Sequence, residues 1–470
     1  MAGADWVELR LDRWPAGANL SEVIEGTDLP VLVTCRMPRD HGEFEGTIED
    51  RRILIEQAIA AGAQGVDLED WEDWQPAYGS SLRLMIRSFH DFESVPDDLP
   101  AIRDRLLAQN ANLAKIVVTV TEIADAAAVM DLLSSTDQEA EATVAFAMGP
   151  TAFPTRVLSA LLGSPFVYGS LAEGEETAPG QIPVSDLAGI YRVKSLNCES
   201  GIFGLLGLPA MHSFGPLLHN RALRKLDVDA VYLPFETARP LDVVRMLPAR
   251  RLRGLSVTAP YKEEVLSLCH RLDSSAEVAV SANTLAFEAH GQVVGYNTDI
   301  AGVIGALERA GLSLPGEGQP GIVLGGGGAA RAAAVALMKM GFGVTLLARS
   351  TDRLRGFAEE HGFDLAPLTE QELTSRTARV VVHATPVGMA GADEDPGCLF
   401  PGWVPSPDCH VLDMIYQPHF TPLLKAVSSA GATPAFGFEM FLTQAAEQLQ
   451  VWTGQTLPEA ELRRYVGGRV

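Results

Sequence analysis

The sequence predicts an α/β protein in which a (β/α)8-type barrel, with its first strand missing, precedes an α/β domain and a Rossmann domain. Three observations support this fold class. Short apolar segments alternate with amphipathic segments over residues 1–193, as in a parallel sheet covered by helices. The run from Gly321 to Arg331 reads as an apolar strand, a glycine turn and the start of an alanine-rich helix, which is typical of a Rossmann unit. The length of 470 residues allows two or three domains.

The composition is that of an ordinary globular protein, with 47% hydrophobic and 20% charged residues. No apolar run is long enough to span a membrane, and Met1 to Asp12 lacks the pattern of a signal peptide. The formal net charge of −24 argues against nucleic acid or an anionic membrane as partner. The five cysteines are scattered without a Cys-x-x-Cys pair, which fits a reducing cytoplasm. We expect a cytoplasmic protein without a metal site, whose partners are small molecules.

Seven segments of the first half read as β-strands, since each is short and apolar. They are Trp6–Leu11, Val31–Cys35, Gly65–Leu68, Leu82–Phe89, Leu113–Val120, Thr143–Met148 and Phe166–Leu171. Amphipathic stretches such as Asp50–Ala61 and Thr121–Leu133 lie between them. Because a closed barrel of this class needs eight strands, we expect an open edge where the first strand is missing.

Polar side chains gather at the carboxyl ends of these strands, where barrel enzymes place their active sites. They are Glu8, Arg10, Arg36, Asp67, Glu69, His90, Lys115 and Arg156. Lys115 is one of only six lysines among 36 basic residues, and its flanks are apolar, which favours an uncharged, nucleophilic amine. Alone, Lys115 could cap a strand, and His90 could be a satisfied core or turn residue. With Glu69 on a neighbouring strand end, the three favour a catalytic site.

Several motifs of the first half follow one another in a distinctive order. They are Glu8-Leu9-Arg10-Leu11-Asp12, Thr34-Cys35-Arg36, Asp67-Leu68-Glu69, Ser88-Phe89-His90-Asp91-Phe92, Ala114-Lys115, Met148-Gly149, Arg156 and Ala178-Pro179-Gly180-Gln181. In order and spacing this half resembles the type I 3-dehydroquinate dehydratases. The resemblance implies that Lys115 forms a Schiff base with the C3 ketone of 3-dehydroquinate. His90 would remove a C2 proton and later protonate the leaving hydroxyl, and Glu69 would orient His90.

The same resemblance implies a substrate site. Arg156 would hold the substrate carboxylate, and the hydroxyls would be bound by Glu8, Arg10, Arg36 and Gln181. Met148 and Thr177 complete this site, and Thr177 stands where many members have serine. Two departures from the family concern the scaffold. The family has a strand and a helix before the Glu-x-Arg strand, and the segment Asp70–Ser81, which is broken by Pro76 and Gly79, replaces a helix.

The glycine turn of the second half predicts a nucleotide site. Gly325 permits the tight turn, Gly327 lets the backbone approach a pyrophosphate, and Ala330 keeps the helix close to the sheet. An ordinary glycine loop is the alternative, but the strand before, the helix after and a second strand from Val344 to Ala348 all fit a nucleotide unit. Arg349 and Arg353 follow that strand where an NAD-binding acid would stand, so the predicted cofactor is NADP.

Lys262 and Asp299 form a second candidate catalytic pair. Lys262 ends the run Val257-Thr258-Ala259-Pro260-Tyr261-Lys262, and Asp299 ends Asn297-Thr298-Asp299. A lysine beside a nicotinamide could protonate a carbonyl oxygen as hydride adds to the carbon. For a lysine in Tyr-Lys-Glu-Glu, a surface ion pair is the ordinary alternative.

Together with the glycine turn, further motifs resemble the shikimate dehydrogenases. They are His212-Ser213, Ala282-Asn283-Thr284, Ala384-Thr385-Pro386-Val387-Gly388-Met389, Asp413-Met414-Ile415-Tyr416 and Gly437 to Gln444. The resemblance implies that Lys262 and Asp299 are catalytic and that shikimate is bound by Ser213, Thr258, Asn283, Tyr416 and Gln444. It implies that NADP is bound by Gly325, Gly327, Gly328, Ala329, Ala330, Arg349, Ser350, Arg353, Thr385 and Gly437. Gly215 departs from the family by replacing the second serine of His-Ser-x-Ser-Pro, and His383 and Ser256 replace asparagines.

The two resemblances imply one bifunctional enzyme of the shikimate pathway, since 3-dehydroshikimate, the product of the first half, is the substrate of the second. We predict a barrel over residues 1–193, a substrate domain over 199–299 with a return over 438–470, and a Rossmann domain over 300–437. One alternative is a quinate or shikimate dehydrogenase of relaxed specificity with a weakened or inactive dehydratase half, because Gly215 opens room where quinate carries an extra hydroxyl. A monofunctional reductase with a decayed barrel and a non-enzymatic sensor or regulator are two further alternatives.

Overall fold

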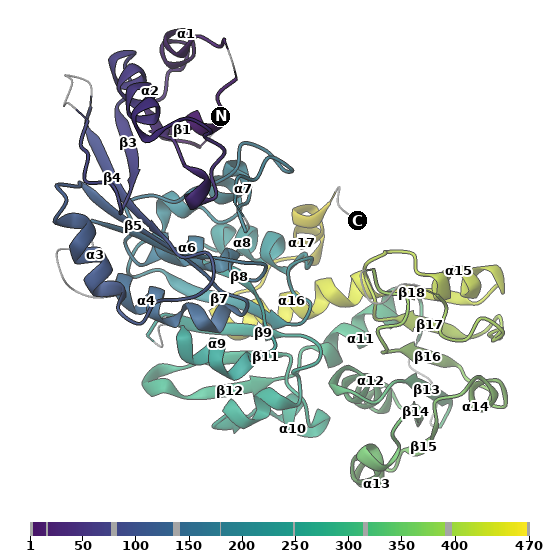
Figure 1. The fold of residues 1–470 in the computed structure, drawn as a ribbon. Coiled ribbons are helices and arrows are strands. Elements are labelled where there is room, and N and C mark those ends of the chain that lie inside the picture. Colours follow the sequence, from purple (N-terminus) through teal and green to yellow (C-terminus); the bar gives the residue numbers. More distant parts are fainter. Residues whose placement is uncertain are drawn as a thin grey trace. The chain divides into compact units, whose positions relative to one another are not determined.

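The computed structural model describes residues 3–15, 17–76, 82–134, 142–178, 180–247, 250–313, 318–390 and 397–467. The chain forms two compact units, one made of Met1–Ser200 with Asp242–Leu247 and the other of Gly201–Leu241 with Pro248–Val470. Within the described ranges, no helix combines the length and the apolar character needed to cross a bilayer. The fold is α/β, as predicted (Figure 1).

The first unit contains a six-stranded, all-parallel sheet whose strands follow chain order. The strands are β1 (Val7–Arg10), β2 (Val31–Thr34), β3 (Gly65–Glu69), β4 (Leu84–His90), β5 (Leu113–Thr119) and β6 (Thr143–Met148). The helices are α1 (Leu20–Glu25), α2 (Ile48–Ala60), α3 (Leu99–Leu107), α4 (Ala127–Ser134), α6 (Phe153–Leu161) and α7 (Val184–Gly189). Strands β2, β3 and β6 are buried throughout, which explains why they read as continuous apolar runs.

The predicted strand at Phe166–Leu171 is wrong, and the described part of the sheet is therefore a half-barrel with edges at β1 and β6. Only Ser170 makes an isolated bridge, to Pro183. Side chains take the place of a seventh strand on the outer edge of β6. Ser164 Oγ accepts a hydrogen bond from Ala145 N at 3.4 Å and donates to Thr143 O at 3.1 Å. Thr155 Oγ1 accepts from Ala147 N at 3.0 Å.

The segment after β3 has no helix in its described part, residues 70–76, as predicted. Residues 77–81 of the predicted irregular segment lie outside the described residues. Buried Glu72 holds this segment in place, since its carboxylate pairs with Arg51 and, at 3.1 Å, with Arg52. The Arg87 guanidinium donates to the carbonyl oxygens of Glu72, at 2.5 Å, and Trp74, at 2.7 Å. Buried charges thus replace helix packing between β3 and β4.

The second unit contains two six-stranded sheets. The first has the order β10-β12-β11-β9-β7-β8, with β11 antiparallel to both neighbours. Its strands are β7 (Gly201–Gly207), β8 (Ala230–Glu236), β9 (Leu252–Val257), β10 (Arg271–Leu272), β11 (Thr284–Phe287) and β12 (Val293–Tyr296). The helices of this region are α8 (Gly215–Lys225) and α10 (Ser274–Ala279), whereas α9 (Pro240–Met246) belongs to the first unit from Asp242 onward.

The other sheet of this unit confirms the predicted Rossmann fold, because its order β15-β14-β13-β16-β17-β18 is all parallel and reverses at β13. The strands are β13 (Pro320–Leu324), β14 (Gly343–Ala348), β15 (Asp364–Pro367), β16 (Val380–His383), β17 (His410–Asp413) and β18 (Thr433–Phe436). The helices are α11 (Asp299–Arg309), α12 (Gly328–Lys339), α13 (Arg355–His361), α14 (Glu370–Thr374), α15 (Pro422–Ser429), α16 (Gly437–Thr453) and α17 (Glu459–Val466). From α16, Gln448 and Trp452 donate to Thr284 Oγ1 and Leu285 O of β11.

Candidate functional site

A cavity in the first unit lies at the carboxyl ends of the strands. It collects side chains from β1, β4, β5, β6 and α6, together with the loops after β2 and before α7. Of the predicted site residues it is lined by Glu8, Arg10, Arg36, His90, Lys115, Met148, Arg156, Thr177 and Gln181. Val117, Phe146, Tyr168 and Ala178 complete the lining. The structure therefore brings these residues to one place, although Lys115 lies within β5 and Arg156 lies on α6, not at a strand end.

Lys115 is buried at 3% exposure in the middle of β5. Its Nζ lies 2.7 Å from Asp67 Oδ2 of β3 and 4.3 Å from the centre of the Tyr168 ring. Burial by itself raises the pKa of Asp67, but the Lys115 and Arg36 cations and the Ser88 hydroxyl outweigh burial and hold that pKa below its ordinary value. A buried amine is thus held in a fixed position by a carboxylate and an aromatic face.

His90 and Glu69 contact each other at the ends of β4 and β3. His90 Nδ1 lies 3.1 Å from Glu69 Oε2, and Arg36 Nη2 lies 2.9 Å from His90 Nε2. A guanidinium can only donate a hydrogen bond, so His90 Nε2 is the acceptor. His90 Nδ1 therefore carries the hydrogen and donates it in a hydrogen bond to Glu69. Burial, helped by Arg36 and Lys115, lowers the pKa of His90, and burial raises that of Glu69 to about 7. The imidazole is therefore neutral near pH 7 and able to act as a base.

The anion-binding side of the cavity is built on Arg156 of α6, which is 1% exposed. Its Nε donates to Gly180 O at 3.1 Å, and its guanidinium lies 4.3 Å from the centre of the Phe146 ring. Burial lowers the pKa of Arg156 to about 10. A buried cation of this kind favours a ligand carboxylate. Arg10, in contrast, is already held by both oxygens of Asp12, at 2.8 and 2.7 Å.

The remaining predicted residues of this cavity make local contacts. Glu8 accepts from Thr34 Oγ1 at 2.7 Å. Gln181 Oε1 accepts from the backbone N and Oγ1 of Thr177 at 2.8 and 3.1 Å. Met148 is buried at the end of β6. These residues and the Arg156 cation thus line the same cavity.

In the second unit, Lys262 Nζ pairs with Asp299 Oδ2, and the two side chains are 12% and 4% exposed. This burial excludes the surface ion pair that the sequence left open. Asn283 Nδ2 donates to Asp299 Oδ1 at 2.8 Å and to Gln444 Oε1 at 3.2 Å. Lys262 after β9, Asn283 before β11, Asp299 of α11 and Gln444 of α16 therefore form one hydrogen-bonded cluster.

Ser213 and Tyr416 form a second contact, with their hydroxyl oxygens 3.2 Å apart. Tyr416 stacks on Phe441, which lies on α16 one turn before Gln444. Ser213 Oγ also accepts from Gly215 N at 3.0 Å. Thr258 lies half-buried in the turn after β9 and shows no side-chain bond to this cluster among the described contacts.

The glycine turn has open space on the side where phosphates would lie. Gly325 adopts a φ of +135°, and a Cβ there would approach Ala384 O to 2.9 Å. A Cβ on Gly327 would meet nothing within 4 Å, so the backbone at the start of α12 is accessible to an anion. Gly328 lies against Lys262 and Ser281, whereas Ala330 is fully buried. The turn therefore fits a dinucleotide pyrophosphate.

The predicted phosphate arginines follow β14. Arg349 and Ser350 are exposed, and the side chain of Arg353 is 78% exposed. Arg353 Nη2 lies 4.0 Å from Glu263 Oε2, and Arg331 Nη2 lies 3.1 Å from the same oxygen. Thr385 follows β16, and Gly437 begins α16 against the carbonyl oxygens of Asp413 and Ile415. The residues present thus fit NADP.

Comparisons with known proteins agree with both sites. A family model described as type I 3-dehydroquinase matches residues 1–197, and one described as shikimate dehydrogenase substrate binding domain matches residues 205–285. The bifunctional 3-dehydroquinate dehydratase/shikimate dehydrogenase of Arabidopsis thaliana is 29% identical over 97% of this chain and 79% of its own length. The shikimate biosynthesis protein AroDE of Chlamydia pneumoniae is 30% identical over 81% of this chain and 76% of its own length.

The chain belongs to the bifunctional dehydroquinate dehydratase/shikimate dehydrogenase family. The second half alone is 36% identical to the NADP(+) shikimate dehydrogenase of Methanopyrus kandleri, over 58% of this chain and 97% of that protein. We call Met1–Ser200 with Asp242–Leu247 the dehydratase unit, and Gly201–Leu241 with Pro248–Val470 the dehydrogenase unit.

Two residues of the dehydratase unit have no role in the sequence-based prediction. The sequence predicts Asp67 at a strand end without a function, and it predicts Tyr168 only as part of a strand. Asp67 and Glu69 are two residues apart on β3, so both point to the same face. That spacing could have suggested a second carboxylate in the site.

At its departures from the family, the dehydrogenase unit forms local networks. His383 Nδ1 lies 3.0 Å from Asp413 Oδ1, and His383 Nε2 lies 2.5 Å from Thr385 Oγ1. Ser256 Oγ accepts from Tyr232 OH at 2.8 Å and donates to Gln448 Oε1 at 2.9 Å. A Cβ on Gly215 would lie 3.2 Å from Ser213 Oγ and 3.3 Å from Tyr232 OH, so the missing serine leaves two hydroxyls facing the position.

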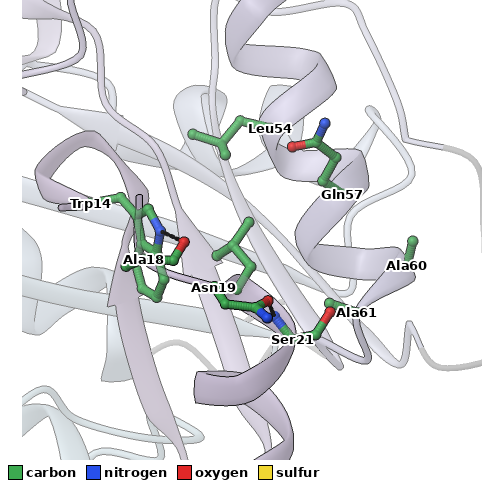
Figure 2. A pocket seen from close by; sticks show the side chains of 9 residues that line it. Trp14, Ala18, Asn19, Ser21, Leu54, Gln57, Ala60 and Ala61 are labelled. Atoms are coloured by element: carbon green, nitrogen blue, oxygen red, sulfur yellow. Dashed lines mark hydrogen bonds between the residues drawn. The ribbon is translucent and has the colours of Figure 1, made fainter. Parts of the chain in front are cut away.

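A larger cavity of the dehydratase unit lies between α1, α2 and the loop before α1 and shares no lining residue with the cavity around Lys115 (Figure 2). It is lined by Trp14, Ala18, Asn19, Leu20, Ser21, Leu54, Gln57, Ala60 and Ala61. None of these lining residues is ionisable. The cavity therefore offers no side chain for acid–base chemistry and no base to activate the hydroxyl of Ser21.

Proposed function

We propose that this chain dehydrates 3-dehydroquinate to 3-dehydroshikimate in the dehydratase unit and reduces 3-dehydroshikimate to shikimate with NADPH in the dehydrogenase unit. The observation that carries the first activity is the cavity that joins buried Lys115, neutral His90 and buried Arg156. For the second activity it is the buried Lys262–Asp299 pair beside the glycine turn.

In the dehydratase reaction, Arg156 binds the substrate carboxylate and so directs the ketone toward Lys115. After its ammonium has lost a proton to water, Lys115 attacks C3, and loss of water from the adduct gives an imine. His90 Nε2 takes the C2 proton once Arg36 has released that nitrogen, and Glu69 stabilises the imidazolium through Nδ1. The imidazolium then protonates the leaving hydroxyl, so that one water departs. Hydrolysis of the imine frees 3-dehydroshikimate and Lys115.

In the reductase reaction, Asp299 and Asn283 fix the position of Lys262, which protonates the carbonyl oxygen of the substrate. Ser213 and Tyr416 bind the substrate carboxylate, and Gln444 binds a ring hydroxyl. NADPH, when bound, supplies the hydride. Arg349 and Arg353 would hold its 2′-phosphate, and the start of α12 its pyrophosphate. The NADP(+) dehydrogenase similar to this half supports the choice of cofactor.

Borohydride trapping tests the first activity. Incubation with 3-dehydroquinate and borohydride should add mass to the peptide that contains Lys115, and Lys115→Met should abolish the adduct. A chain without the adduct, and without release of 3-dehydroshikimate, would have an inactive dehydratase unit. For the second activity, 3-dehydroshikimate should drive NADPH oxidation measured by absorbance.

A relaxed dehydrogenase specificity is the second candidate, and Gly215 favours it. The predicted room at Gly215 is small, since a Cβ there would lie 3.2 Å from Ser213 Oγ and 3.3 Å from Tyr232 OH. The two hydroxyls nevertheless face this position, and quinate carries one hydroxyl more than shikimate in this region. Quinate should then be oxidised at a measurable rate, and Gly215→Ser should reduce that rate more than shikimate oxidation. Normal shikimate kinetics without quinate oxidation would exclude this candidate.

A further inference from the structure

The side chain of Tyr168 lines the dehydratase cavity and carries a buried hydroxyl to which no described residue is hydrogen-bonded. Lys115 and Arg36 line the same cavity. A buried hydroxyl without a partner is costly, so such a group inside a site indicates a bond that forms only when the ligand is present.

The ring of Tyr168 is held in place independently of its hydroxyl. It contacts the Phe166 and Phe146 rings at centroid distances of 5.3 and 6.3 Å, and Lys115 Nζ lies 4.3 Å from its centre. These contacts use the faces and edges of the ring and would be made equally well by phenylalanine. Packing therefore explains an aromatic residue at this position but not a tyrosine.

The surroundings keep the phenol protonated. Burial and the nearby Asp67 and Glu8 carboxylates raise the pKa of Tyr168 well above its ordinary value. A neutral phenol can donate one hydrogen bond and can accept others. Because Lys115 is the predicted point of covalent attachment and its Nζ lies over the Tyr168 ring, the phenol belongs to the part of the cavity that receives the substrate.

We propose that Tyr168 is a further substrate-binding residue of the dehydratase site, whose hydroxyl donates a hydrogen bond to an oxygen of the 3-dehydroquinate ring held at Lys115. This inference rests on the proposed dehydratase function and adds to it a contact in the cavity that the strand-end motifs did not include. The aromatic ring positions Lys115, and the hydroxyl recognises the substrate.

The substitution Tyr168→Phe tests the hydroxyl alone in the full-length chain. We expect kcat/KM for 3-dehydroquinate to fall about 10-fold, which corresponds to ~1.4 kcal/mol, and the dissociation constant measured by calorimetry to rise in step. The melting temperature should stay the same or increase, because the variant removes a buried unpaired hydroxyl. Reduction of 3-dehydroshikimate by NADPH should not change.

Tyr191→Phe is the matched control, since Tyr191 is a buried tyrosine of the same unit that packs on Phe153 and does not line the cavity. Kinetic and binding constants of Tyr168→Phe within twofold of wild type would overturn the proposal. If wild type binds 3-dehydroquinate without converting it, the proposed dehydratase function is wrong. The ratio of the dissociation constants of Tyr168→Phe and wild type for 3-dehydroquinate then still decides the role of Tyr168. A wild type that does not bind 3-dehydroquinate would overturn both.

Discussion

At the scale of single residues, Glu69 links the dehydratase chemistry to pH. Its carboxylate accepts from His90 Nδ1 at 3.1 Å, and burial raises its pKa from 4.5 to about 7. A folded-state pKa above the unfolded value gives stability that is fully present below pH 4.5 and is lost as the pH rises through 7. Catalysis instead requires a pH above the pKa of Glu69, because only the ionised carboxylate stabilises the imidazolium of His90.

We therefore expect wild-type kcat for dehydration to fall as the pH drops below about 7. Glu69→Gln should lower kcat by about 10- to 100-fold and remove this acidic limb. The same variant should make the unfolding of the dehydratase unit less dependent on pH, since glutamine cannot lose a proton. Rate profiles and thermal unfolding at about pH 5 and pH 8 measure both effects. An acidic limb that persists in Glu69→Gln would assign the titration to another group.

The sequence predicted Lys115, His90 and Arg156 in one site, and the three do line one cavity, but only His90 ends a strand, since Lys115 lies within β5 and Arg156 on α6. It could not show which of Asp67 and Glu69 contacts the lysine, since both point to the same face of β3. Nor could it show the unpaired hydroxyl of Tyr168, since only the three-dimensional arrangement reveals a missing partner.

At the scale of elements, the outer edge of β6 shows why one predicted strand is absent. The pattern at Phe166–Leu171 is apolar because Phe166 and Tyr168 pack on Phe146, not because the segment joins the sheet. Thr155 and Ser164 already bond backbone groups of that edge. Periodicity predicts burial well, but it does not distinguish a strand from an extended segment covered by side chains.

Thr155→Val should destabilise the dehydratase unit by about 1–3 kcal/mol, because the buried Ala147 N–H loses its acceptor while the side-chain shape is kept. Denaturant unfolding of the full chain, followed in the transition of this unit, measures the change. Thr151→Val is the control, since Thr151 is partly exposed and its hydroxyl makes only a 3.4 Å contact with Thr121 O. Equal effects of both variants would show that the edge of β6 does not depend on this bond.

At the scale of the whole molecule, the chain has two compact units, and the division of the second unit into a substrate domain and a Rossmann domain stays a prediction. The Rossmann order follows from the alternation of strands and helices around the glycine turn. The division of the second half is harder to predict because α16 begins directly after β18 and carries Gln448 and Trp452 to β11. One helix thus connects both sheets, and the finer boundaries at residues 299 and 438 stay a prediction.

The two predicted active sites draw all their described residues from separate units, so each activity should survive loss of the other. Lys115→Met should lower dehydration by about 10³-fold or more and leave NADPH oxidation by 3-dehydroshikimate unchanged, and Lys262→Met should do the reverse. Because 3-dehydroshikimate is a free product of the first site, an equimolar mixture of the two variants should convert 3-dehydroquinate to shikimate after a lag. The lag should shorten as the concentration of the Lys115→Met chain rises, since capture of the intermediate is then bimolecular. Coupled absorbance assays measure the lag and the amount of shikimate that the mixture forms. A mixture that never forms shikimate would mean that the intermediate passes between the sites of one chain without release.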